Sequence, residues 1–434
     1  MARDKTISGI DIGTSKITTL IASVTDDQEL RIIGVASLAS KGLRKGQIVN
    51  IEEATSAVSE SLEAAERMAG VSVGKTFITV GGNHIASLNS HGVVAVAEPD
   101  REISESDVHR VIDAAKAISL PASREILHII PRGFTVDGQD GIVDPVNMTG
   151  VRLEVDTHVI TGGSIAIKNL QKCVGELGVD VAGIVFGGLA SARAALSDTE
   201  QELGAILIDV GGGTTDVAIY VEGALSYSSV IPIGGINITK DLAAGLQVSL
   251  ESAEKIKIAL SQIPKMPVMP DQTEDEKNKK ALTSDELDLG SLGIPEHIRT
   301  ISRKTISEGI IKPRLNEIMS MVALEIKKSG FGGLTPSGVI LTGGGALTVG
   351  MAESARRNLA MPVHIGMPSH ISGLIEEITS PSFAASVGLL IYGLKSDKTD
   401  LGGSGFQGFS KPGERMDMKG LAGKLVDLVK SFLP

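Results

Sequence analysis

Residues 202–225 read ELGAILIDVGGGTTDVAIYVEGAL, and this stretch decides the fold. The apolar run AILIDV carries Asp209 near its end, a turn of glycines and threonines follows, and a second apolar run, TDVAIYV, leaves the turn. Two β-rich runs around a short glycine-rich turn are typical of neighbouring strands. The stretch therefore predicts a strand–turn–strand unit with an acidic residue beside the turn.

The N-terminus carries a second copy of this unit. Residues 10–13 (IDIG) match residues 208–211 (IDVG), and in both places a Gly, Thr or Ser turn separates two β-rich runs. A short D-x-G match is common by chance, but the shared strand–turn–strand setting makes this match stronger. The repeat indicates two similar domains that face each other.

Composition narrows the class of protein. The 434 residues suffice for about three domain-sized units at about 150 residues each. With 42% hydrophobic and 21% charged residues, the chain should fold as a soluble globular protein. The single cysteine excludes a disulfide framework and fits a reducing compartment. The net charge of -11, without a strong basic patch, excludes nucleic acid as a partner. The start of the chain lacks the apolar core of a signal peptide.

The remaining chain alternates helical and β-rich segments, which predicts a mixed α/β fold. We expect helices over 52–69, 104–118, 165–177 and 242–260, and strands over 76–81 and 338–342. Residues 298–328 should be helical with a break at Pro313. Residues 264–290, with three prolines and the run EDEKNKK, should form a solvated surface loop.

Three glycine-rich turns, each after an apolar run, are candidates for holding phosphate. Backbone N–H groups of such turns can cradle phosphate oxygens, and Thr and Ser hydroxyls add donors. Each turn alone is more often structural. Together with Asp11 and Asp209, which could hold the waters of a Mg²⁺ ion, they form a phosphate-and-metal site hypothesis. The motif of a P-loop is absent. The turns are Gly13, Thr14 and Ser15; Gly211, Gly212, Gly213 and Thr214; and Gly343, Gly344 and Gly345.

Three motifs follow one another along the chain: GIDIGTSK, LIDVGGGTTD and VILTGGGA. Their order is that of the two phosphate loops and the adenosine loop of the actin/Hsp70/hexokinase superfamily, which the chain resembles. This resemblance implies an actin-like α/β fold. Two ribonuclease-H-like domains would surround a nucleotide cleft, each with a smaller subdomain.

Within the superfamily the chain most resembles the FtsA family of bacterial cell-division proteins, from about residue 6 to 394. The more specific segments are residues 202–225 followed by IPIGG, then VILTGGGA and SFAASVGLLIYG. The resemblance implies subdomain 1A (1–83 and 162–197), an inserted subdomain 1C (84–161), subdomain 2A (198–242 and 330–394) and subdomain 2B (243–329). A flexible linker (395–415) and a terminal amphipathic helix (416–434) would follow.

The resemblance also implies ATP and Mg²⁺ as ligands. Lys16 would reach the phosphates, Asp11 and Asp209 would hold Mg²⁺ through water, and Gly235 would lie near the ribose. Glu254 and Lys257 would flank the nucleoside, although an ordinary exposed helix face is an equal alternative. The second phosphate loop (Gly211, Gly212, Gly213, Thr214 and Thr215) would wrap the β- and γ-phosphates, and Gly343, Gly344 and Gly345 would approach the adenosine.

One departure from the superfamily concerns catalysis. Many relatives orient the attacking water with a Glu or Gln in the first connecting helix, but here that region reads VFGGLASARAAL and has neither. Asp216 is the nearest polar candidate. Because water orientation is a large part of such hydrolysis, we expect slow ATP turnover and a nucleotide that acts mainly as a conformational and assembly switch.

The family resemblance implies protein partners as well. Subdomain 1C would serve self-association into homopolymer filaments and contacts with later cell-division membrane proteins. Subdomain 2B would receive the C-terminal peptide of the tubulin-like FtsZ. Arg303 and Glu308 are the charged candidates for that contact, and a solvated helix face is the alternative.

The last 18 residues, DMKGLAGKLVDLVKSFLP, predict an amphipathic helix on grounds independent of the family. Lysines opposite an apolar side suit an anionic lipid surface. A partner groove or the protein's own core are alternatives, although the preceding linker argues against the core. Gly420 and Gly423 lower helicity, so the helix should fold on the lipid. The apolar side is Met418, Leu421, Leu425, Leu428, Val429 and Phe432.

The expected function is therefore a polymerising, ATP-binding tether of the FtsZ ring at the cytoplasmic face of the bacterial inner membrane. Three rivals share the superfamily. A PilM-like pilus-assembly adaptor would lack the linker and terminal helix, a metabolite kinase would need a catalytic Asp that we cannot assign, and an Hsp70-type chaperone would be longer.

Overall fold

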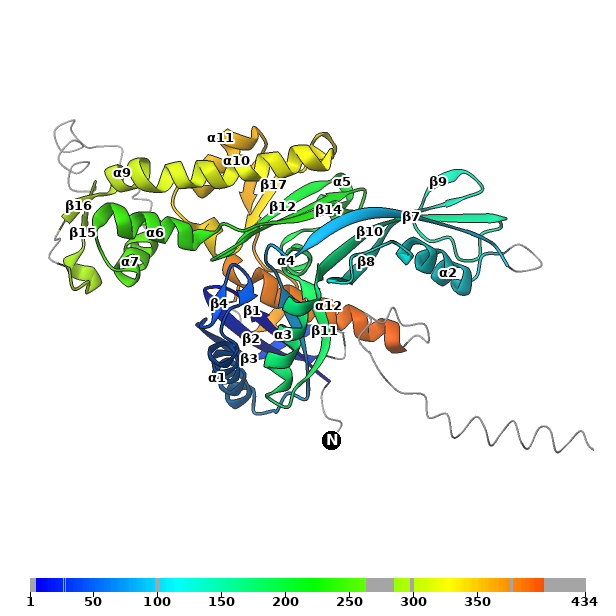
Figure 1. The fold of residues 1–434 in the computed structure, drawn as a ribbon, viewed down its shortest axis with the longest axis horizontal. Coiled ribbons are helices and arrows are strands. Elements are labelled where there is room, and N and C mark those ends of the chain that lie inside the picture. Colours follow the sequence, from blue (N-terminus) through cyan, green and yellow to red (C-terminus); the bar gives the residue numbers. More distant parts are fainter. Residues whose placement is uncertain are drawn as a thin grey trace, which may run out of the picture.

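The structure is a computed structural model that describes residues 5–25, 27, 29–97, 102–262, 285–296, 300–374 and 378–401. Two α/β halves, each built on its own sheet, lie one above the other in Figure 1, and a smaller unit extends from each end. The membrane-binding residues proposed from the sequence, and most of the predicted linker, lie in 402–434 and so outside the described residues.

The first half is a six-stranded sheet in the order β11-β6-β1-β2-β3-β19. Its strands are β1 (Thr6–Ile12), β2 (Lys16–Val24), β3 (Leu30–Ala39), β6 (Lys75–Val80), β11 (Asp180–Phe186) and β19 (Ile371–Gly373). Helices α1 (Ile51–Ala69) and α3 (Ser164–Gly175) pack against it, and β4 (Leu43–Arg44) and β5 (Gln47–Ile48) form a small hairpin. Asn50 caps the start of α1, and Gly70, in the left-handed region, ends it.

The second half is a five-stranded sheet in the order β14-β13-β12-β17-β18. Its strands are β12 (Ala205–Val210), β13 (Thr215–Val221), β14 (Ala224–Ile231), β17 (Val339–Thr342) and β18 (Val363–Ile365), with α5 (Asp198–Leu203) and α11 (Met351–Leu359) beside them. Three 3-10 turns, η3 (Gly332–Leu334), η4 (Gly344–Leu347) and η5 (Pro381–Phe383), complete it.

The internal repeat is confirmed as two antiparallel hairpins. β1 pairs with β2, with Asp11 opposite Thr18, and β12 pairs with β13, with Asp209 opposite Asp216. β1 and β12 each have a parallel neighbour on the other side, β6 and β17 respectively. Both central strands are buried on both faces, which explains their continuous apolar runs.

One small unit, at the right of Figure 1, is inserted after β6. It has a four-stranded sheet in the order β7-β10-β8-β9, and α2 covers one face. Its elements are β7 (Ala86–Ala95), α2 (Glu105–Lys116), β8 (Arg124–Val136), β9 (Gln139–Ile142) and β10 (Arg152–Gly163). A separate apolar cluster that includes Val111 and Leu153 forms its core. Gly92 lets α2 approach β7, because a Cβ there would lie 2.3 Å from the carbonyl oxygen of Val111.

The other small unit, at the left of Figure 1, corrects three sequence predictions. Residues 242–260 form two helices, because Gln247 is left-handed and Ser249 caps the second. Residues 300–302 are a strand, and the helical run that follows continues through Pro313, directly after a π-helical turn over residues 307–311. Of the predicted loop, 285–290 is structured. The elements are α6 (Gly235–Leu246), α7 (Leu250–Ser261), β15 (Glu286–Asp288), η1 (Gly290–Leu292), β16 (Thr300–Ser302), α9 (Arg303–Ile306), the π-helical turn η2 (Ser307–Ile311) and α10 (Lys312–Ser329).

Two helices connect the halves through their centre. α4 (Gly187–Ala195) leads from β11 toward the second sheet, and α12 (Ala384–Leu401) packs across it and against β1 and β6. A Cβ at Gly388 would lie 1.8 Å from the carbonyl oxygen of Ala190. The two backbones are therefore in direct contact. α12 continues to Leu401, past the residue 395 at which the sequence analysis begins the linker. Within the described ranges, no helix is both long and apolar enough to cross a membrane.

Gly388→Ala is expected to destabilise the protein strongly. The added methyl group would force α12 away from α4, and overpacking of this kind costs about 1–3 kcal/mol or more. The urea midpoint of unfolding should fall. Gly175→Ala is the matched control, because a Cβ there meets no atom within 4 Å and alanine favours the helix. Equal midpoints for the two variants would contradict the proposed contact.

Candidate phosphate and metal site

The first two glycine turns meet between the two halves. A Cβ at Gly212 would lie 2.6 Å from the hydroxyl of Ser15, and a Cβ at Gly213 would lie 2.7 Å from the hydroxyl of Thr14. Side chains at either position would push the two hairpins apart. Because both residues are glycines, the backbone of the β12–β13 turn can contact the side chains of the β1–β2 turn. Backbone N–H groups and hydroxyls meet where the two turns touch.

Asp11 and Asp209 lie at the ends of β1 and β12, beside these turns. The Thr79 hydroxyl donates to Asp11 over 2.7 Å and the Ser386 hydroxyl over 3.3 Å, while Ser191 on α4 donates to Asp209. Burial raises the pKa of Asp11. Burial, with the nearby Asp11, raises the pKa of Asp209 to about 6. The fold thus holds two carboxyl groups whose charged form burial disfavours.

Asp216, opposite Asp209 on β13, is the third acid of this cluster. It is buried, and its Oδ1 has no hydrogen-bond partner among the described residues. Burial, then Asp209 and Asp11, raise the pKa of Asp216 well above its ordinary value. Gly187 makes room for it at the start of α4, since a Cβ there would lie 2.8 Å from the Asp216 carboxylate. An unpaired polar atom in this position indicates a ligand or water.

Lys16 is the cation that the structure places in this cluster. Its Nζ donates to the Ser382 hydroxyl over 3.3 Å and lies 3.7 Å from the centre of the Phe383 ring. Burial lowers the pKa of Lys16, whereas Asp11 and Asp209 oppose that shift. The family resemblance implies that Lys16 reaches the phosphates, and the structure places its Nζ beside the acids and against η5.

The third glycine turn closes on the end of β12. Gly343 has φ 80°, and a Cβ there would lie 2.1 Å from Oδ1 of Asp209. A Cβ at Gly345 would lie 2.4 Å from Cγ1 of Val210. Glycine is therefore required at both positions, for conformation at the first and for close approach at both. The three turns come from distant parts of the sequence and meet at one place.

The helices α6 and α7 lie beside the second glycine turn and carry Gly235, Glu254 and Lys257. The N–H of Gly235, at the start of α6, donates to the carbonyl of Gly211 over 2.9 Å. From α7, Lys257 donates to Glu254 over 2.7 Å and to the Thr239 hydroxyl over 2.9 Å. This pair is thus tied to α6 beside the second turn. Arg303 and Glu308, by contrast, lie in the far unit with β15 and β16 and take no part in this cluster.

Several polar residues of the cluster were missed by sequence reasoning. Thr79, Ser191, Ser382 and Ser386 all hydrogen-bond to Asp11, Asp209 or Lys16. Thr79, Ser191 and Ser386 are single hydroxyls among small or apolar neighbours, and such residues carry no motif. Ser382 and Ser386 lie in the segment SFAASVGLLIYG, and the family resemblance of that segment implies no role for either hydroxyl.

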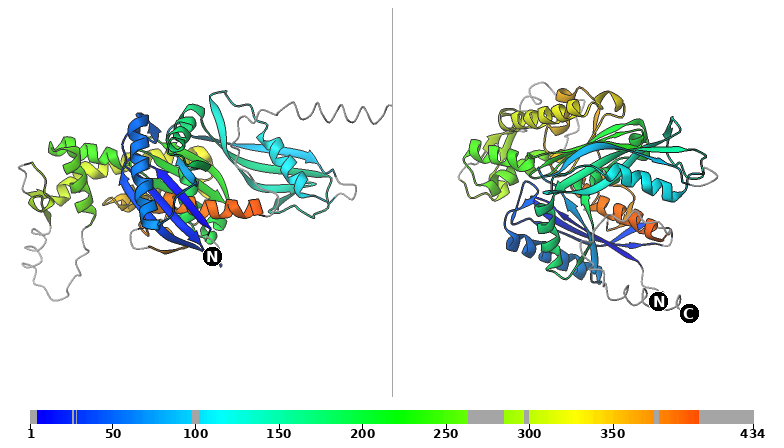
Figure 2. Two further views of the ribbon diagram at one scale, coloured as in Figure 1. Left: turned by 90° about the horizontal axis from the view of Figure 1, so that it is seen from below. Right: turned by 45° about the vertical axis from the view of Figure 1, so that its right-hand side comes forward.

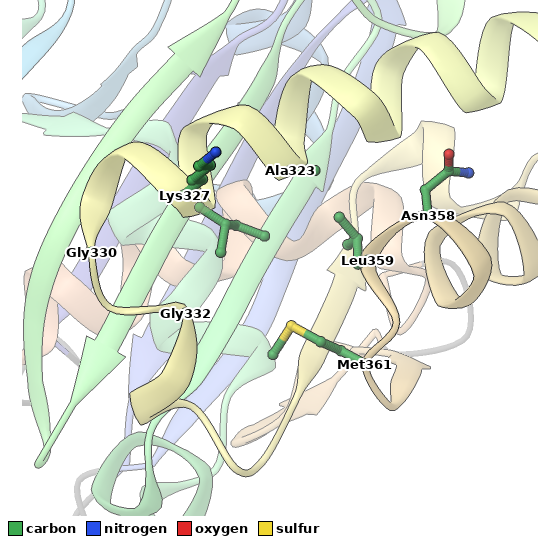
Figure 3. Close-up of a pocket in the computed structure, with 8 residues that line it drawn as sticks. Ala323, Lys327, Gly330, Gly332, Asn358, Leu359 and Met361 are labelled. Atoms are coloured by element: carbon green, nitrogen blue, oxygen red, sulfur yellow. The ribbon is translucent and has the colours of Figure 1, made fainter.

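The residues present fit a phosphate ligand with a divalent cation. Two carboxylates flank the turns, a third carboxyl has an unpaired oxygen, and one lysine lies among them. Carboxylates and hydroxyls are the donors that Mg²⁺ prefers, while the turns supply N–H groups. A separate hollow of 250 Å³ between the end of α10 and α11, with Lys327, Leu359 and Met361 at its rim (Figure 3), includes none of these residues.

Two facing ribonuclease-H-like halves, joined by central helices and meeting at paired acidic hairpins, define an actin-like protein. A comparison with solved structures agrees. The chain is similar to the structure titled PilM-PilN type IV pilus biogenesis complex, with a TM-score of 0.61, 15% sequence identity, and coverage of 89% of this chain and 98% of that one.

Sequence comparisons define the family. The chain matches the models described as "Cell division protein FtsA" over residues 206–388 and "SHS2 domain inserted in FTSA" over residues 82–161. It is 39% identical to the cell division protein FtsA of Pseudomonas aeruginosa, covering 90% of each chain. It is 41% identical to that of Borreliella burgdorferi, covering 89% of this chain and 90% of the relative. The chain belongs to the FtsA family of cell division proteins.

Asp209→Asn is expected to stabilise the ligand-free protein at neutral pH. Below pH 3.8 the carboxyl is protonated whether the chain is folded or unfolded, so it contributes nothing. Between pH 3.8 and about 6 the folded chain keeps a proton that the unfolded chain has lost, so stability falls as pH rises. Above that range the penalty is at most about 3 kcal/mol.

The measurement is the urea midpoint at pH 4 and pH 7.5, without Mg²⁺ or nucleotide. Asp209→Asn should raise the midpoint at pH 7.5 and not at pH 4. Asp180→Asn, at an exposed position, is the control and should show no such pH-dependent gain. A loss of stability in Asp209→Asn at pH 7.5 would overturn the interpretation.

Proposed function

We propose that the chain binds ATP with Mg²⁺ between its two halves and, as a polymer on the membrane, tethers the FtsZ ring. The meeting of three glycine turns around Asp11, Asp209 and Lys16 is the observation that carries the nucleotide site. Family membership supports the role in cell division.

In this proposal each residue of the cluster has a separate task. The two phosphate loops would hold the phosphates through backbone N–H groups and hydroxyls. One loop is Gly13, Thr14 and Ser15, and the other is Gly211–Gly213, Thr214 and Thr215. Asp11 and Asp209 would hold waters of Mg²⁺, whose charge stabilises their ionised forms. Gly235, Glu254 and Lys257 would contact the nucleoside, and Gly343–Gly345 would approach the adenine ring.

Hydrolysis should be slow. Asp216 lies near the start of α4, and burial, then Asp209 and Asp11, raise its pKa, which disfavours the ionised form that a base for activating water needs. We expect a turnover far below the about 10 s⁻¹ of a median enzyme. Phosphate release with Mg-ATP measures it, with Asp209→Asn as the blank. Turnover of tens per second would contradict a switch-like role for ATP.

The far unit is the proposed site for the FtsZ C-terminal peptide. Arg303 at the start of α9 is half-buried: its Nε donates to the carbonyl of Glu286 over 3.4 Å, and its Nη1 is buried without a partner among the described residues. The exposed part of the guanidinium would offer its N–H donors to a carboxylate of the peptide. Glu308, already paired with Lys312, lies in the π-helical turn η2, and such turns are frequent at functional sites.

Arg303→Gln is expected to weaken binding of a synthetic FtsZ C-terminal peptide by about tenfold or more, because a charge-assisted contact is worth about 1.5–3 kcal/mol. Fluorescence anisotropy of the labelled peptide with the full chain measures it. Lys304→Gln, at the exposed neighbouring position, is the matched control and should bind nearly as well as the unchanged chain. Equal losses in both variants would indicate only a general charge effect.

The membrane contact is assigned to residues 416–434. The apolar side of the predicted helix would enter the lipid interface while Lys419, Lys424 and Lys430 face the headgroups. One such helix binds weakly, so polymerisation would strengthen attachment through avidity. The inserted unit of residues 84–161 is the proposed surface for polymer contacts and later division proteins. This arrangement would place the protein at the cytoplasmic face of the membrane.

Leu428→Asn should strongly reduce sedimentation of the full chain with anionic liposomes, because it removes an apolar anchor. Asp427→Asn is the matched control: it introduces the same residue one position away on the polar side and should bind as well or better. A chain stopped before Met416 should stay in the supernatant. Sedimentation of the stopped chain would refute the tail as the tether.

The pilus-adaptor alternative shares the fold, as the similarity to the PilM-PilN structure illustrates. Identity to FtsA proteins over nine-tenths of the chain favours the division role. The liposome experiment separates the two, since the adaptor would have no lipid-binding tail.

A further inference from the structure

A groove of 1220 Å³ lies between the inserted unit and the body of the protein. Residues of α12, α2 and β8 line it, and Figures 1 and 2 show these elements on the same side of the molecule; residues of α4 and of the β13–β14 hairpin line it as well. Small-molecule pockets measure about 300–1,000 Å³, so this groove suits a chain segment better than a metabolite.

Polar and apolar groups line the groove in nearly equal measure, and its apolar residues come from several elements. Ile126 on β8 and Leu394 on α12 are half-buried, and Ile112 on α2 lines the same space. Ile126 belongs to none of the apolar clusters that make up the cores of the described residues. Its half-buried side chain therefore lies outside those cores, and an apolar occupant of the groove would remove more of its surface from water.

The charges at the groove are balanced. Three acidic side chains (Glu29, Asp113 and Asp198) accompany three basic ones (Lys116, Arg193 and Lys395). A strongly acidic or strongly basic polypeptide would therefore gain little there. An apolar segment with mixed, nearly cancelling charges fits better. Residues 416–434 have that character, with three lysines and two aspartates around one apolar side.

The position of α12 brings this segment within reach. Leu394 and Ser396 line the groove, and α12 ends a few residues later at Leu401. The 14 residues 402–415 can span up to about 46–50 Å when extended, so the segment can return to the groove from which its own helix leaves. A tether of this kind gives an effective concentration of the order of millimolar, so even a weak contact would be populated.

We propose that, away from lipid, residues 416–434 dock their apolar side into the groove between α12 and α2–β8 of the same chain. The residues that dock are those assigned above to the membrane: Met418, Leu421, Leu425, Leu428, Val429 and Phe432. One apolar side cannot contact the groove and the lipid at once. Docking therefore competes with membrane attachment, and this second consequence rests on the proposed tether function.

Hydrogen–deuterium exchange of the full chain without lipid tests the docking itself. Leu425→Asp with Leu428→Asp should speed exchange in α2 and β8 several-fold. Lys424→Asp with Lys430→Asp adds the same two charges to the polar side and should leave α2 and β8 unchanged. Unchanged exchange in both double variants would overturn the proposal and leave the groove open to another protein. Protection that rises with protein concentration would also overturn it, because the segment would then come from a second copy.

A groove variant gives the reciprocal test. Ile126→Arg should speed exchange in residues 416–434 and, at limiting anionic lipid, raise the sedimented fraction of the full chain a few-fold. Faster exchange without any liposome binding by any variant would support docking and refute the tether, so the two proposals fail separately. Unchanged exchange in the tail of a folded Ile126→Arg protein would count against docking.

Discussion

The backbone contact between α4 and α12 is the constraint on which the rest of the structure depends. α4 carries the chain from the first sheet to the second, and α12 returns across it to pack on β1 and β6. The lack of a side chain at Gly388 allows this crossing, because the backbone of Ala190 lies directly against it. Gly393 lets the same helix lie close to the first sheet, because a Cβ there would lie 2.7 Å from the Phe77 ring. Because the helices are this close, the two hairpin turns also come close enough to face each other. The two helices also position the acids. Ser191 on α4 donates a hydrogen bond to Asp209, and Ser386 on α12 donates one to Asp11.

The acidic cluster is unfavourable for the ligand-free fold and favourable for a cation. Burial raises the pKa of Asp11, Asp209 and Asp216; Asp11 adds to the shift of Asp209, and both add to that of Asp216, with Lys16 as the nearby opposing charge. Such a site stores electrostatic free energy that a divalent cation can release on binding. Since the acids come from both halves, that release would favour the closed arrangement of the halves. This gives a physical route by which a bound nucleotide could bias assembly without rapid hydrolysis.

The proposed contacts outside the cleft are each weak on their own. One guanidinium, one short amphipathic segment and one inserted unit would combine only when many copies assemble. Competition between the groove and the lipid for residues 416–434 would add a threshold for membrane attachment. A single chain must give up the docked contact before the same residues can bind lipid. In a polymer on the membrane that cost is shared, since neighbours hold each tail near the surface.

The sequence by itself determined the repeated hairpins, the order of the three glycine turns, and the acids beside them. These are local patterns: two β-rich runs around a short turn can form little else. It did not reveal the hydroxyls of Thr79, Ser191 and Ser386, the break after Leu246 or the helix that runs through Pro313, because single polar residues and helix ends depend on neighbours distant in the chain. Only the tertiary structure decided that Gly212 and Gly213 contact Ser15 and Thr14, that Asp216 is left with an unpaired oxygen, and that a groove opens beside α12. Those features arise where separate elements pack, and the packing distance is set by backbone approach, which no local pattern encodes.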